Sequence, residues 1–316
     1  MGVLDLLRGR TSPERRATPG PAPLGDDLFD DEFQKKLDTL AIVSRRVFAG
    51  RMRAERRSKK KGSGVEFADH RDYAPGDDFR FVDWNVYQRF GKLLVRLYEE
   101  EEDLGITFIV DTSASMGFGA GRKFDQARRL CAALAYVGLA NLDRVSVVGV
   151  SDSVVARLPE GRGRARIFNV FRFLRALSPG GTTNLSDAVS TVVAAQKRRG
   201  LAVLLSDLYD PSGFERGINV LRYNKFEPYV VHLTDPADAR PDLRGDVQLY
   251  DCETGEEREV TITDALLDRM EGAYRQYLVE VEQFCARNRV PYFAADTSVP
   301  FDELVLRVFR RGGFLR

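Results

Sequence analysis

The chain of 316 residues has few of the side chains on which many metal sites and acid–base mechanisms depend. It contains three cysteines, Cys131, Cys252 and Cys285, which lie far apart and form no CxxC pair. An odd number of scattered cysteines argues against a disulfide framework or a zinc site and fits a reducing, cytoplasmic compartment. Only two histidines, His70 and His232, are present, so few imidazoles are available to act as a catalytic acid or base.

Long apolar runs and net charge are also missing. No apolar stretch approaches the roughly 18 residues of a membrane span, and the N-terminal MGVLDLLRGR has too short an apolar part for a signal peptide. The formal net charge is +1, which gives the chain as a whole no bias toward nucleic acid or an anionic membrane. A Walker-type GxxxxGK(S/T) sequence is lacking, which argues against ATP hydrolysis by this chain.

Apolar residues are plentiful enough for a sizeable core, since hydrophobic residues make up 43% of the chain and charged residues 30%. Residues 1–37 are rich in Pro, Gly, Arg and Asp and predict a poorly ordered tail. A helical pattern covers Phe33 to Phe48, and strand-like alternation covers Lys92 to Tyr98. We therefore expect the tail, an N-terminal segment over 38–103 and a main domain over 104–316.

Strands and helices alternate in the main domain. Short apolar runs predict strands over Ile106–Val110, Val145–Val150, Val154–Leu158, Leu201–Leu205, Tyr229–Leu233 and Val290–Ala294. Apolar residues at helical spacing predict helices over 124–137, 167–177, 186–196, 211–223, 265–285 and 301–309. A hairpin is expected over Val247–Thr261, with Thr254-Gly255 at its turn. This alternation predicts an α/β fold, a doubly wound and mostly parallel sheet flanked by helices, with a β-rich N-terminal elaboration.

The residues most suited to chemistry lie between Gly105 and Met116, in GITFIVDTSASM. A run typical of a buried strand ends at Asp111, and Ser113 and Ser115 follow at once. Ligands of open α/β sheets bind at the carboxyl ends of the strands. Carboxylate and hydroxyl oxygens are the donors that Mg²⁺, Ca²⁺ and Mn²⁺ prefer. The stretch therefore predicts a metal site.

Two further loops supply oxygen donors of the same kind. Thr182 and Thr183 follow a pair of glycines, and Asp207 lies just past a buried strand. Because a parallel sheet aligns its strand ends along one edge, we expect these groups to converge with Asp111 on one ion. Two carboxylates and several hydroxyls leave room for waters, which suits Mg²⁺.

Two other interpretations of the motif stay open. Asp111 and the serines after it could simply cap the helix that follows. Asp111 could also be the nucleophile of a metal-dependent phosphatase or hydrolase. Phosphotransferases of that kind usually have a second acid two residues after the first, where this chain has Ser113.

An upstream cluster of charges surrounds the only tryptophan. Asp77, Asp78, Arg80 and Asp83 lie beside Trp84, and paired carboxylates could serve as general acid and base. We favour a structural or contact cluster in which Arg80 holds the acids in place, because the acids are accompanied by no nucleophile and by one histidine alone.

A basic run precedes this cluster, with seven Arg or Lys residues between Arg51 and Lys61. Such runs can bind phosphates or nucleic acid. The weak overall charge and the absence of a nucleic-acid fold signature favour a solvated segment instead. The acidic run Glu99 to Asp103 offers an internal counterweight.

The oxygen-bearing loops resemble those of von Willebrand factor A domains. Residues 111–115, DTSAS, look like the DxSxS signature of these domains, and Asp207 in LLSDLYD resembles their third-loop aspartate. Thr183-Asn-Leu, followed by Ala188, resembles their threonine loop, and this spacing selects Thr183 rather than Thr182.

The resemblance implies a metal-ion-dependent adhesion site. Ser113, Ser115 and Thr183 would bind the metal directly, and Asp111 and Asp207 would bind it directly or through water. A partner's Asp or Glu would complete the coordination sphere, so the implied activity is metal-dependent protein binding rather than catalysis.

The upstream block narrows the resemblance further. EFADHRDYAPGDDFRFVDW, and then VRLYEEEEDLGITFIVDTSASM, closely resemble the family called domain of unknown function 58, which joins such a family-specific block to a von Willebrand A-like domain. The resemblance covers about residues 40 to 300. Members often lie beside MoxR-type AAA+ ATPases, which implies an adaptor or assembly factor that binds such an ATPase or its client.

Overall fold

The computed structural model describes residues 9–11, 26–48, 57–62, 66–101, 105–118, 122–196 and 198–310. The chain forms two compact units, one from residues 1–44 and 104–315 and the other from residues 45–103. Within the described ranges, no helix combines the length and the apolar character needed to cross a membrane.

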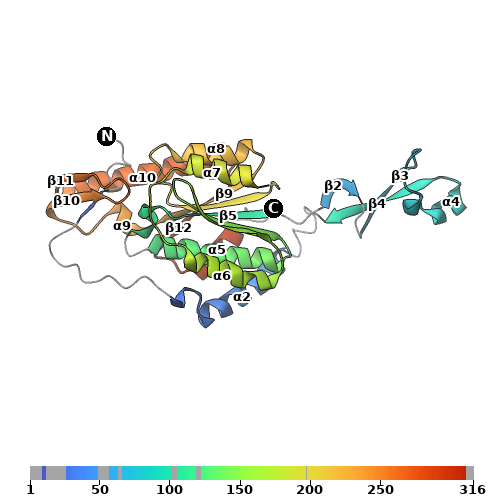
Figure 1. Ribbon diagram of the computed structural model, residues 1–316, viewed down its shortest axis with the longest axis horizontal. Coiled ribbons are helices and arrows are strands. Elements are labelled where there is room, and N and C mark those ends of the chain that lie inside the picture. The colour runs from blue at the N-terminus through green and yellow to red at the C-terminus, as the bar shows by residue number, and fades with distance from the viewer. Residues whose placement is uncertain are drawn as a thin grey trace. The chain divides into compact units, whose positions relative to one another are not determined.

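A six-stranded sheet forms the centre of the larger unit (Figure 1). Its strands run in the order β12 (Tyr292–Asp296), β9 (Glu227–Thr234), β8 (Leu201–Ser206), β5 (Gly105–Asp111), β6 (Arg144–Val150) and β7 (Val154–Gly161). Neighbouring strands are parallel except β6 and β7, which form an antiparallel edge pair. The predicted doubly wound, mostly parallel α/β sheet is therefore confirmed.

The order of the strands marks where a ligand site belongs. The chain passes from β5 to β6 on one side and later returns to β8 on the other side of β5. The topology therefore switches direction beside β5, and open α/β sheets bind ligands at the carboxyl edge next to such a switch.

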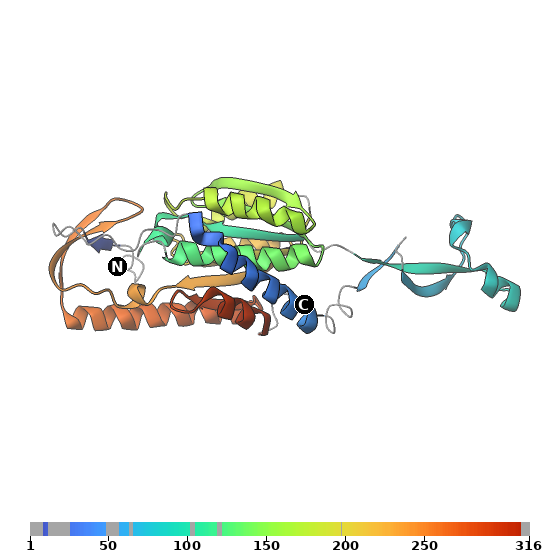
Figure 2. The ribbon, with the colours of Figure 1, turned by 90° about the horizontal axis from the view of Figure 1, so that it is seen from below.

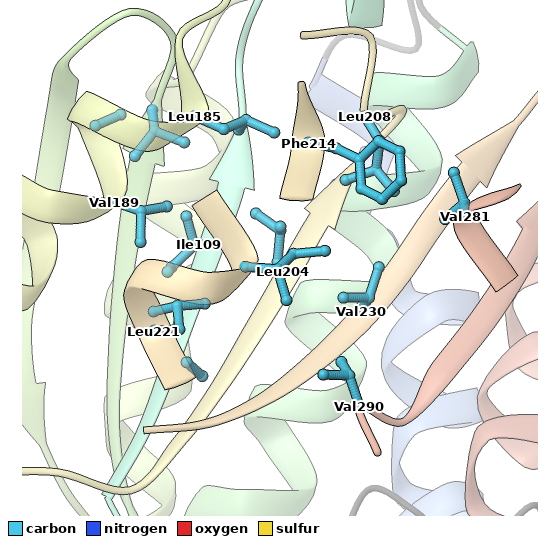
Figure 3. Close-up of a cluster of buried hydrophobic side chains, with 14 of the residues drawn as sticks. Ile109, Leu185, Val189, Leu204, Leu208, Phe214, Leu221, Val230, Val281 and Val290 are labelled. Atoms are coloured by element: carbon cyan, nitrogen blue, oxygen red, sulfur yellow. The ribbon is translucent and has the colours of Figure 1, made fainter. Parts of the chain in front are cut away.

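Helices cover both faces of this sheet. On one face, α7 (Leu185–Ala195), α8 (Phe214–Tyr223) and α10 (Asp264–Arg287) enclose the buried cluster drawn in Figure 3. The other face carries α5 (Arg122–Ala140) and α6 (Ile167–Ala176), with α11 (Phe301–Arg310) against α5. The strands between them are apolar on both sides, as a sheet covered on both faces requires.

Residues 26–44 belong to this unit, although the sequence predicted a poorly ordered tail over 1–37. In η1 (Asp26–Phe29) and α2 (Asp31–Phe48), Phe29 and Phe33 pack on Phe171 of α6, with ring centroids 4.7 and 6.1 Å away. Figure 2 shows α2 on the α5 side of the sheet, next to α11. Burial of large rings fixes this segment, and the composition of the tail as a whole concealed it.

The predicted hairpin consists of β10 (Gly245–Asp251) and β11 (Glu257–Ile262). A short strand, β1 (Gly9–Thr11), pairs with the other edge of β10 and makes it the central strand of a three-stranded sheet. The rest of the predicted tail before residue 26 lies outside the described residues.

The smaller unit contains a second three-stranded sheet, in the order β2 (Arg57–Gly62), β4 (Leu94–Glu101) and β3 (Glu66–Asp72). Its antiparallel register sets Arg57 opposite Glu101 and Lys61 opposite Glu99. The described half of the basic run therefore lies beside the acidic run. The half before Arg57 lies outside the described residues.

Candidate metal centre

Asp111 ends the central strand β5, and its side chain is fully buried. Its Oδ1 accepts a hydrogen bond from the backbone N–H of Ser113 at 2.9 Å. Its Oδ2 accepts one from the hydroxyl of Ser206, the last residue of the neighbouring strand β8, at 2.5 Å. The carboxylate is thus held in one orientation at the switch point of the sheet.

The serines after β5 face each other. Ser113 and Ser115 are buried, and their hydroxyl oxygens are 3.0 Å apart. Oxygens on adjacent corners of an octahedron around Mg²⁺, each roughly 2.1 Å from the ion, lie about 3.0 Å apart. The two hydroxyls therefore have the spacing of neighbouring ligands of one magnesium ion.

Hydrogen bonds join the threonine loop to its neighbours. The N–H of Gly180 donates to the carbonyl oxygen of Thr112 at 2.7 Å, which connects the threonine loop to the loop after β5. The N–H of Leu185 donates to the carboxylate of Asp210 in the third loop at 2.8 Å. Between these two bonds, Thr183 is buried, whereas Thr182 is exposed.

Asp207 follows β8 and is also fully buried. Its Oδ2 lies 2.7 Å from the ammonium nitrogen of Lys123, which lies 3.0 Å from Asp238 in α9 (Pro236–Ala239) as well. Burial acts to lower the pKa of Lys123, but the two carboxylates outweigh it and raise that pKa above the ordinary value. Lys123 is therefore charged and neutralises part of the acidic group.

The remaining negative charge suits a divalent cation. Burial, and then the charge of Asp207, hold the pKa of Asp111 well above its usual range, although three hydrogen bonds from Ser206 and Ser113 act to lower it. Lys123 pairs with Asp207 and Asp238. Together with an ionised Asp111, these three carboxylates and one ammonium would carry two negative charges. The five predicted ligands thus supply oxygens and charge of the kind that Mg²⁺ prefers, and the two serine hydroxyls also have a suitable spacing.

Hydroxyl oxygens are essential to this fit. Over the described ranges, no group of three or more His, Cys, Asp or Glu side chains could hold a metal by itself. A metal at this edge of the sheet would therefore need the ligands of the predicted set that are not carboxylates, which are Ser113, Ser115 and Thr183.

His232 supports Asp207 from the neighbouring strand β9. The side chain is fully buried, with Nε2 3.1 Å from the carbonyl oxygen of Asp207 and Nδ1 2.9 Å from the hydroxyl of Tyr292. A carbonyl oxygen only accepts, so Nε2 carries the proton and Nδ1 accepts from the tyrosine. Burial lowers the pKa of His232 to about 4, which keeps the ring neutral.

Sequence reasoning missed three residues around the site. His232 was recognisable as a lone polar residue in an apolar strand, and Lys123 as a lysine next to the apolar face of its helix. Glu253, in the turn after β10, gave no local signal. Its carboxylate accepts hydrogen bonds from the hydroxyl of Thr183 at 2.7 Å and from the N–H of Thr183 at 3.0 Å.

The acids of the upstream cluster pair with separate bases in the smaller unit. Arg80 pairs with Asp78 at 2.6 Å, and its side chain is 85% exposed. Asp77 pairs instead with Arg71, at 2.5 Å. The prediction that Arg80 holds the acids in place is therefore wrong for Asp77, whose carboxylate is held by both terminal nitrogens of Arg71 on β3.

Asp83 has a structural role of its own. It lies 3.0 Å from Arg96 and from His70, and it caps the helix α4 (Trp84–Phe90). The hydrogen bond from Arg96, and then that from His70, hold the pKa of Asp83 well below its usual range. Arg80 does not hold this acid either, and Trp84 beside it is 51% exposed.

Removing the buried ammonium should destabilise the fold. In Lys123→Met, Asp207 and Asp238 lose their shared cation inside the protein, and we expect the free energy of unfolding to fall by about 3–5 kcal/mol. Adding Asp238→Asn to this variant should recover part of the loss. Urea unfolding in chelator measures both effects. Lys92→Met, at an exposed position, is the control, and an equal effect there would contradict the role of Lys123.

The buried histidine should resist protonation. Its pKa is about 4 in the folded chain and about 6.5 when unfolded. The unfolded chain therefore takes up a proton first, and stability present above pH 6.5 should decline by about 3 kcal/mol as the pH falls to 4. In His70→Gln, one imidazole remains, and its NMR shifts should stay those of a neutral ring at pH 5. Titration near pH 6.5 would contradict the assignment.

Comparisons with known proteins identify relatives of this chain. Uncharacterized protein Rv1480 of Mycobacterium tuberculosis (strain ATCC 25618 / H37Rv) and Uncharacterized protein Mb1516 of Mycobacterium bovis are each 30% identical to the chain over 254 residues. The matches cover 78% of this chain and 80% of each relative. A crystal structure of conserved hypothetical protein BatB from Bacteroides thetaiotaomicron is 12% identical, with a TM-score of 0.39 over 66% of this chain and 99% of that one.

The family model described as Protein of unknown function DUF58 matches residues 69–277. This range includes the upstream cluster and the three loops of the candidate metal centre. The chain therefore belongs to the DUF58 family.

Proposed function

We propose that the chain is a metal-dependent protein-binding module. Mg²⁺, or Ca²⁺ or Mn²⁺ in its place, is bound directly by Ser113, Ser115 and Thr183. Asp111 and Asp207 bind it directly or through water. One observation carries the proposal, namely that three loops far apart in sequence bring buried oxygens to one edge of the sheet. An ion held by so few charged ligands attracts a further carboxylate, which a partner protein supplies.

Binding accounts for the site better than catalysis does. Phosphotransferases that use an aspartate nucleophile usually have a second acid two residues after it, where this chain has Ser113. The neighbouring His232 is neutral and fully buried, and both of its nitrogens are engaged. These observations favour a site that holds an ion over a phosphatase or hydrolase that uses Asp111.

The proposed partner follows from the family resemblance. Members of this family often lie beside MoxR-type AAA+ ATPases, so we propose that the chain is an adaptor or assembly factor for such an ATPase or its client. A cytoplasmic location is part of the proposal, and the three cysteines agree with it because each is a free thiol. We propose no role for nucleic acid.

Metal binding tests the site directly. Titration of the pure chain with Mn²⁺, followed by the electron paramagnetic resonance signal of free Mn²⁺, should show one site. Ser113→Ala should weaken the affinity about tenfold or more because a direct ligand is lost. Ser190→Ala, on the exposed face of α7, is the matched control. Equal affinity in the two variants would refute the proposed ligand set.

Partner capture tests the function. Wild type and Ser113→Ala are each used as bait for a MoxR-type ATPase encoded in the same genome, with Mg²⁺ and with chelator. We expect capture by wild type with Mg²⁺ alone. Capture in all four conditions would remove the metal from the mechanism. Turnover of phosphate esters by wild type, lost in Asp111→Asn, would favour the hydrolase instead.

A further inference from the structure

The turn between β10 and β11 reaches the threonine loop of the candidate metal centre. Its Glu253 accepts a hydrogen bond on Oε1 from the hydroxyl of Thr183 at 2.7 Å. Its Oε2 accepts one from the backbone N–H of the same residue at 3.0 Å. Both polar groups that Thr183 offers to this side are thus engaged by one carboxylate. The contact joins residues 70 positions apart in the sequence.

The turn is built to hold this glutamate in place. The carboxylate of Asp251 accepts from the N–H groups of Glu253 and Thr254, at 2.8 and 3.1 Å. Gly255 closes the turn with a φ of +73°, which glycine adopts without strain. Because β10 is paired on both edges, the strand that leads into the turn is fixed as well.

The carboxylate of Glu253 lies beside one of the proposed metal ligands. The hydroxyl oxygen of Thr183 is the atom that the proposed function gives to the ion. Oε1 of Glu253 lies 2.7 Å from that oxygen, an ordinary O–H···O hydrogen bond. Adjacent ligands of a magnesium octahedron lie about 3.0 Å apart, so the two oxygens are close enough to become neighbouring ligands of one ion.

We propose that Glu253 is an internal ligand that fills the coordination position otherwise open to a partner's carboxylate. In the metal-bound chain, Oε2 would keep the N–H of Thr183, and Oε1 would pass from the hydroxyl to the ion. Asp111 and Asp207 would then act through water, because no three acidic side chains of the described residues are placed to hold a metal together. The hairpin thus closes the site in the free protein, and a partner binds by displacing Glu253. This inference rests on the proposed function and adds its regulation.

The test compares Glu253→Gln with Glu256→Gln on Mn²⁺-loaded protein. Glu256 is an exposed acid of the same turn, so its variant controls for charge near the hairpin. Glu253→Gln should bind Mn²⁺ about tenfold more weakly. Its Mn²⁺ should carry one more inner-sphere water, counted by electron–nuclear double resonance. Added acetate should displace that water in Glu253→Gln but not in wild type or Glu256→Gln. Circular dichroism confirms that each variant is folded.

The outcomes separate this inference from the function on which it rests. If wild type binds Mn²⁺ through Ser113 and Glu253→Gln shows the same water count, the internal ligand is refuted and the metal site stands. A weaker affinity with an unchanged water count also refutes it, because Glu253 would then act through Thr183 alone. If wild type binds no Mn²⁺ at this site, the proposed function itself fails.

Discussion

The burial of the Asp111 carboxylate at the end of the central strand is the constraint on which the site depends. A carboxylate without exposure to water is costly unless charge or hydrogen bonds replace that water. The chain supplies a backbone N–H from the following loop and a hydroxyl from the end of the neighbouring strand β8. These donors tie two loops together but add no charge, which leaves a position suited to a cation.

The surroundings of Asp207 solve a similar problem in a different way. This second carboxylate receives a full charge from Lys123 and shares it with Asp238. The backbone carbonyl oxygen of Asp207 also accepts a hydrogen bond from the neutral ring of His232. Two buried acids at one edge of the sheet therefore differ in how they are neutralised. Asp207 is paired with a charge from the fold, whereas the hydrogen bonds described for Asp111 come from uncharged groups.

Much of this arrangement could be read from the sequence, for reasons that are local. Apolar runs of strand length identified the strands of the larger unit, and apolar residues at helical spacing identified its helices. Burial of the sheet on both faces makes the strand pattern strong. The loops after β5 and β8 followed from the alignment of strand ends in a parallel sheet. The residues that could not be predicted in this way contact partners that are far away in the sequence.

Lys123 and Glu253 illustrate the limit. A lysine beside an apolar helix face is usually solvated. The two acids that pair with this one lie 84 and 115 residues later in the sequence, in the loop after β8 and in α9. The turn that carries Glu253 was foreseen, but its contact with Thr183 depends on how the hairpin docks. Residues 26–37 were assigned to a tail because their partner, the ring of Phe171, comes from a distant helix.

An internal carboxylate changes what a partner must provide. A ligand tethered in the same chain competes at an effective concentration of about millimolar or more, and the rigid turn around Glu253 strengthens that competition by removing the need to order a loop. A single acidic side chain from a partner would be a weak competitor. Stable binding would require further contacts that open the hairpin, so specificity would reside in the surface around β10 and β11. The ion would accept a carboxylate from a partner that makes those contacts.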